Sequence, residues 1–199
     1  MNFAIKRLAH AAPVIGVGLL LSISTARAQK TYTVETGRTT VTLADSFISA
    51  LKSLDVTPGT ISPTELKDGR VNFPITGGAI DLETGRGQLL HSGGLTLTAG
   101  KTEVKLQSFI IDSTGSEPVI TGLVVEDGTL VGRVSLFKIH YPGGITLPLK
   151  PNHGVLKRDD LGLSLTATAA SALNAAFHVT ALSAGVDIGT ADVDSILAW

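Results

Sequence analysis

The sequence predicts an all-β fold, either a two-sheet antiparallel sandwich or a flattened barrel, with one or two short helices. Glycine, threonine, valine, isoleucine and leucine dominate the chain after residue 29, and branched aliphatic residues and threonine favour strands. Short apolar runs recur roughly every 8–12 residues, and turn residues separate them. Because no linker or break in composition interrupts this pattern, we expect a single domain over residues 29–199.

Residues 1–28 are expected to be a cleavable signal peptide. Lys6 and Arg7 precede an apolar stretch from about Ala11 to Leu21, and small residues flank Arg27. Secretory signals have this order of charged, apolar and small residues. The apolar stretch is short for a bilayer core of about 30 Å. We therefore expect cleavage after Ala28, export to the periplasm or the medium, and no membrane span in the mature chain.

Composition excludes several classes of protein. The chain has 16 basic and 17 acidic side chains, and three of the basic ones lie in the signal peptide. The mature domain therefore has no basic surplus, and we expect no nucleic-acid partner. Cysteine is absent, which removes disulfides and thiolate chemistry. No nucleophile elbow, P-loop or dinucleotide-binding glycine pattern occurs, so we expect a protein that is not an enzyme.

The first third of the domain predicts strands followed by one helix. Residues 32–35 and 39–43 alternate as strands do. Over residues 45–54, apolar side chains fall on one helical face, and Asp45 is expected to cap the helix. Pro58, Gly59 and Pro63 are expected to break the chain.

The remainder predicts short strands, one more helix and a loop. Glu126-Asp127-Gly128 is a hairpin-turn signal. Thr168–Phe177 is alanine-rich and predicts a helix capped by Thr168. The prolines within residues 141–152 predict a loop or edge segment. Glycine pairs at 77–78, 93–94 and 143–144 are expected in turns. Strands are expected at residues 70–75, 79–82, 88–91, 95–98, 103–111, 118–125, 129–139, 161–166 and 188–196.

Histidine and tyrosine supply the candidate binding residues. His91 ends a strand before two glycines, so it is either an axial haem ligand, a hydrogen-bond partner or base for a ligand, or an exposed turn histidine. Tyr141 follows His140, and tyrosinate is a known haem-iron ligand; the alternative is an ordinary half-buried ring at a strand end. His153 and His178 are further candidates. Their spacing does not fit a structural zinc site.

Two stretches resemble the HtaA-like domain of exported bacterial proteins. The first runs from Gly69-x-Val-x-Phe-Pro-Ile-Thr-Gly-Gly78 through Thr84-Gly-Arg-Gly87 to His91-Ser-Gly-Gly-Leu-Thr-Leu97. The second runs from Leu163 to Phe177 and on to Ala191. The resemblance covers residues 45–196. It implies an all-β fold with a short helix, and haem binding through a tyrosine ligand, a supporting histidine and a phenylalanine wall.

The resemblance assigns these roles to particular residues. The histidine of the family's H-x-G-x-L-x-L motif falls on His91, and Phe177 matches as a wall. The family's S-F-x-x-Y segment is similar to residues 46–50, where Ala50 stands in the tyrosine's place. Tyr141 would replace that tyrosine if the fold brings it to the same pocket. The resemblance thus implies an exported module that binds haem or another flat apolar ligand.

The alternative interpretation is a non-catalytic structural or protein-interaction domain of the cell envelope, with an envelope protein as its partner. In that case the glycines, alanines and threonines serve only turns and packing.

Overall fold

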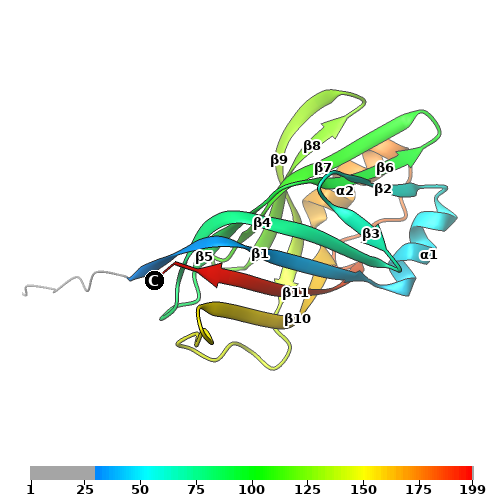
Figure 1. Cartoon of the computed structure of the whole chain (residues 1–199). Coiled ribbons are helices and arrows are strands. Elements are labelled where there is room, and N and C mark those ends of the chain that lie inside the picture. The colour runs from blue at the N-terminus through cyan, green and yellow to red at the C-terminus, as the bar shows by residue number, and fades with distance from the viewer. Residues whose placement is uncertain (1–29, 199) are drawn as a thin grey trace, which may run out of the picture.

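A computed structural model describes residues 30–198, which fold into strands and two short helices (Figure 1). The predicted signal peptide, residues 1–28, lies outside this range. Neither helix within it has the length and apolar character needed to cross a membrane. In chain order the elements are β1 (Thr31–Leu43), α1 (Asp45–Ser53), β2 (Thr57–Ile61), β3 (Glu65–Lys67), β4 (Arg70–Asp81), β5 (Gly87–His91), β6 (Gly94–Ala99), β7 (Thr102–Asp112), β8 (Val119–Glu126), β9 (Thr129–His140), β10 (Val155–Leu165), α2 (Ala167–Phe177) and β11 (Asp187–Leu197).

Eight of the strands form a closed antiparallel barrel. Their order is β7-β5-β4-β1-β11-β10-β9-β8, and β8 pairs back with β7. Strand β6 pairs with the part of β7 that β5 leaves free, β2 pairs with β6, and β3 pairs with β4. Closure leaves the barrel strands without open edges. The all-β prediction is confirmed in its barrel form.

Alternating side chains place the core inside the barrel. In β7, Val104 and Leu106 are buried, and so are Phe109 and Ile111. The two pairs are out of phase by one residue, and a bulge at Ser108, with φ of 53°, turns the second pair inward again. The ring of Phe109 meets that of Phe73 edge to face, with centroids 5.2 Å apart. The bulge therefore keeps both halves of a long strand facing the core.

Both helices form where they were expected, but their caps differ from the prediction. Asp45 is the first residue of α1, and no side chain caps that helix. Thr166 caps α2, because its Oγ1 accepts a hydrogen bond of 3.0 Å from the backbone N–H of Ala169. The predicted cap, Thr168, lies inside the helix and is exposed. Strand β10 runs up to residue 165, so the helix starts as soon as the strand ends.

Turn signals were correct at some sites, among them the glycine pair at 143–144, and wrong at others. Asp127 and Gly128 have φ of 46° and 83° and link β8 to β9 as a two-residue hairpin. The glycine pair at 77–78 lies inside β4 instead, where a Cβ on Gly78 would strike the backbone of β5. Pro58 and Gly59 belong to β2, an edge strand that tolerates proline.

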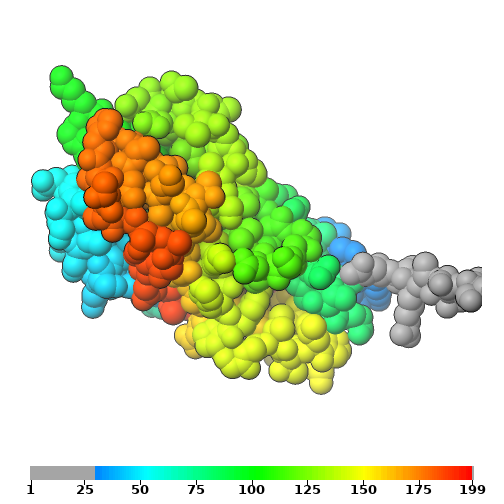
Figure 2. All heavy atoms as spheres, turned by 180° about the vertical axis from the view of Figure 1, so that it is seen from behind, coloured from blue at the N-terminus to red at the C-terminus, as the bar shows by residue number. Residues whose placement is uncertain are grey.

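The two ends of the barrel are covered differently. Figures 1 and 2 show α1 and α2 toward one end and the segment 141–154, the predicted loop, toward the other. This segment is fastened to the β4–β5 turn, because the N–H of Leu149 donates a hydrogen bond of 2.7 Å to the carbonyl of Leu82. The two helices cover the opposite end of the barrel, and the cavity lies at that end.

Candidate functional site

A cavity lies between the two helices and the interior of the barrel. Every strand and both helices of the described chain contribute side chains to its wall, including Phe47 and Leu51 of α1 and Leu173 of α2. The only polar side chains in the wall are those of Thr39 and His91. The cavity is therefore an apolar space with one polar spot.

The cavity is space that the side chains leave unfilled. Its volume is about 70 Å³. A single buried water needs about 10–15 Å³ on this measure, so the cavity has room for several waters. Ligand pockets typically have mostly apolar walls. Apolar walls offer water few hydrogen bonds, so they favour an apolar occupant.

Among the lining side chains, Leu66 of β3 is the most exposed. Phe47 and Pro58 are half-buried, and Leu66 is 37% exposed, although all three line the cavity. Figure 1 shows the elements that carry them side by side at the helical end of the barrel. The cavity wall is therefore apolar where it is most exposed.

Strand alternation places His91 in the cavity wall. On β5, Leu89 and His91 are buried while Leu90 points to solvent. Only 6% of His91 is exposed. Its Nε2 lies 2.8 Å from Oγ1 of Thr39, a residue of β1 that is 3% exposed. This hydrogen bond spans β4, which pairs with both strands.

Burial keeps the His91 ring neutral. Desolvation lowers the pKa of His91 from 6.5 to about 4, and the backbones of Phe109 and Leu89 offset only part of this shift. Within the described chain, Nδ1 of His91 is buried without a hydrogen-bond partner. A neutral imidazole has one N–H and one lone pair. Because Nε2 is taken by Thr39, Nδ1 is left to offer either a proton or a lone pair.

Of the three predicted site residues, the structure brings only His91 to the cavity wall. Tyr141 is half-buried in the segment after β9, where the guanidinium of Arg158 lies 5.8 Å from its ring centre. Burial raises the pKa of Tyr141. Phe177 is half-buried at the end of α2, and Leu173 lines the cavity from that helix instead. Neither Tyr141 nor Phe177 is part of the wall.

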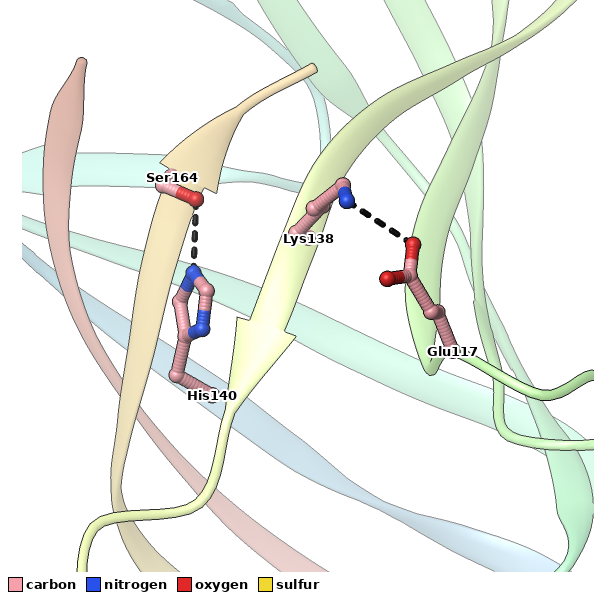
Figure 3. A network of polar contacts seen from close by, with 4 residues as sticks. All are labelled: Glu117, Lys138, His140 and Ser164. Atoms are coloured by element: carbon pink, nitrogen blue, oxygen red, sulfur yellow. Dashed lines mark hydrogen bonds and ion pairs between the residues drawn. The ribbon is translucent and has the colours of Figure 1, made fainter. Parts of the chain in front are cut away.

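A second histidine forms a polar contact away from the cavity. His140 Nε2 lies 2.7 Å from Oγ of Ser164 (Figure 3). The neighbouring Glu117 carboxylate accepts a hydrogen bond of 2.8 Å from Lys138, which lowers the pKa of Glu117. As Figure 3 shows, that carboxylate is directed to Lys138 rather than to the imidazole. The serine and histidine therefore lack the third group that orients the base in a hydrolytic triad.

The other candidates have structural positions. His178 ends α2 in the left-handed conformation, and His153 adopts a positive φ in the segment before β10. No group of three or more potential metal ligands occurs within residues 30–198. Sequence reasoning missed Thr39, whose only signal was its place in phase with Val41 on an alternating strand.

Several solved structures share this fold. The C-terminal domain of HtaA from Corynebacterium glutamicum aligns with 84% of this chain and 99% of its own, with a TM-score of 0.64 and 16% identity. The N-terminal domain of the same protein aligns with 83% and 99%, with a TM-score of 0.62 and 11% identity. The heme binding protein HtaB from that organism aligns with 85% and 96%, with a TM-score of 0.54 and 13% identity.

No family model matches the chain, and no curated protein matches its sequence. The structural likeness covers nearly the whole of each solved domain. The chain therefore has an HtaA-like fold, as its glycine-rich motifs predicted, with a sequence that has diverged far from those of the solved domains.

Proposed function

We propose, from this HtaA-like fold, that the barrel is a binding module for a small, flat, mostly apolar molecule, with haem as the first candidate. The observation that carries the proposal is the apolar cavity at the helical end of the barrel. A domain that packs for stability alone fills such a space with side chains. HtaB, which shares the fold, is a haem-binding protein, and this supports a porphyrin as the first ligand to test.

His91 and Thr39 are the polar contact in this proposal. Their mutual hydrogen bond fixes the ring, so the pair would present a polar spot at a set place in the wall. A few placed polar groups in an apolar pocket commonly set a ligand's orientation. The pair would thus orient a molecule held mainly by apolar contact.

The cavity suits one part of haem better than the other. The apolar character of the wall suits the body of the macrocycle. The wall offers few ligands for the iron. His91 is the only lining side chain with a nitrogen or sulfur donor, and its Nε2 is already hydrogen-bonded to Thr39. No carboxylate, phenol, thioether or thiol lines the wall. We therefore assign no role to the iron in binding.

The export and domain assignments are part of the same proposal. Residues 1–28 would direct the chain out of the cytoplasm, and residues 29–199 would act as one non-catalytic binding domain in the periplasm or the medium. The charged, apolar and small-residue order of the N-terminus supports export.

Hemin titration of the purified protein tests the proposal. Saturable binding with a shifted Soret band is expected. Leu173→Trp, which fills the cavity from α2, should weaken binding by at least about tenfold. Leu130→Trp is the matched control, because Leu130 is 64% exposed on the β8–β9 hairpin. If both variants bind hemin like the parent, the cavity is not the site. Leu51→Phe serves as a second filling variant should Leu173→Trp fail to fold.

Exposed apolar side chains favour a second candidate, a protein-interaction domain. Leu130 and Val131 at the tip of the β8–β9 hairpin are 64% and 55% exposed, and Ile145 and Leu147 are exposed in the segment 141–154. Such groups can mark contact sites. Size-exclusion chromatography of the parent protein and of Leu130→Ser tests this candidate. It predicts that the parent chain self-associates and that the substitution weakens this association.

A further inference from the structure

We infer that the cavity holds its ligand through the apolar body of the molecule and forms no bond to a metal, so that an iron-free porphyrin binds about as well as haem. This inference rests on the proposed function and specifies the class of ligand within it. It departs from the tyrosine-ligated site that the family resemblance implied.

The wall offers very few electron-pair donors. Protein ligands to haem iron are the side chains of histidine, cysteine, methionine and tyrosine. Among the lining residues, only His91 belongs to that set. The remaining polar group is the hydroxyl of Thr39. A protein–iron bond in this cavity would therefore have to come from a single imidazole.

Neither nitrogen of that imidazole is well placed for a metal. Nε2 lies 2.8 Å from Oγ1 of Thr39. Moving it to an iron would leave the threonine hydroxyl buried without a partner, which is unfavourable. Nδ1 is fully buried, and the backbones of Phe109 and Leu89 lie against the ring. This nitrogen is the one nearer the main chain, so a rigid macrocycle cannot approach it as it would Nε2.

In the described part of the chain, the other side chains that could ligate haem iron lie outside the cavity wall. Tyr141 lies outside the cavity wall, with Arg158 over its ring. His140 is hydrogen-bonded to Ser164 and is not part of the wall. On α1, Ala50 has no donor atom, although Phe47 and Leu51 on either side of it line the cavity. Within residues 30–198, therefore, no second donor lines the space that His91 faces.

Parallel titrations with hemin and iron-free protoporphyrin IX test the inference. Both are added to the purified protein and followed by absorbance and by porphyrin fluorescence. We expect dissociation constants that agree within about threefold. His91→Leu combined with Thr39→Val, which replaces both polar partners by apolar ones, should change the two constants by the same factor. Leu173→Trp should weaken both.

The outcomes separate the inference from the function beneath it. If hemin binds more than about 100-fold tighter than protoporphyrin IX, and the double variant removes that advantage, a protein–iron bond exists and the inference is overturned while the binding function stands. If neither porphyrin binds, the proposed function falls and the inference with it. Equal binding of both, lost together in Leu173→Trp, supports both.

Discussion

Lowering the pH from about 7.5 to about 5 is expected to destabilise the folded protein through His91. The ring is 6% exposed, and burial lowers its pKa from 6.5 to about 4. In the unfolded chain the same ring takes up a proton near its ordinary pKa. Between these two values the unfolded state binds more protons than the folded state, so stability falls as the pH falls.

The size of the effect follows from the two pKa values. The contribution of His91 is fully present above pH 6.5 and is lost as the pH falls toward 4. Proton linkage gives a loss of about 2 kcal/mol between pH 7.5 and pH 5, and of about 3 kcal/mol once the pH is below 4. A loss of this size is a large share of the stability of an ordinary domain.

Urea denaturation followed by far-UV circular dichroism at the two pH values measures this loss. The control is the double variant His91→Leu/Thr39→Val, which removes the titrating ring without leaving a buried hydroxyl unpaired. Replacing both partners of a buried hydrogen bond can be nearly neutral, so the variant should be close to the parent in stability near neutral pH. It should lose about 2 kcal/mol less than the parent on acidification. Equal losses in the two proteins would refute the assignment of His91 as a buried neutral ring.

Three further predictions concern single positions. Thr166→Ala should cost about 1–2 kcal/mol in urea denaturation because it removes the α2 cap, whereas Thr168→Ala, at an exposed helical site, should cost about 0.5 kcal/mol or less. Gly78→Ala should cost at least about 2 kcal/mol or prevent folding, since its Cβ would strike β5 and its φ is 145°; Gly100→Ala, with open space around it, should cost about 1 kcal/mol. Ala50→Tyr should strengthen hemin binding and leave protoporphyrin IX binding unchanged in parallel titrations, because a phenolate beside the cavity supplies an iron ligand.

Local signals in the sequence predicted much of the fold. The alternation over residues 39–43 and the Asp127-Gly128 turn are short-range features whose meaning does not depend on the rest of the chain. The two helices were found for the same reason. The sequence did not distinguish a sandwich from a barrel. Barrel closure depends on the pairing of β7 with β8 and on bulges such as the one at Ser108, which adjust the strand register.

The candidate site shows the same limit more sharply. His91 was identifiable from its place beside two glycines. Its partner Thr39 lies 52 residues away and looks like any other strand threonine. Tyr141 and Phe177 are plausible ring-bearing residues by type, but spacing along the chain does not say which side of a barrel a side chain reaches. Only the three-dimensional pairing of β1, β4 and β5 brings Thr39 to His91.

The most direct test of the apolar binding site is a crystal structure of the protein with protoporphyrin IX. We predict the macrocycle at the helical end of the barrel, in contact with Phe47 and Leu173 and with the edge of the His91 ring. Density for the porphyrin outside the cavity, beside Tyr141 and Arg158, with the cavity left as it is here, would contradict the account.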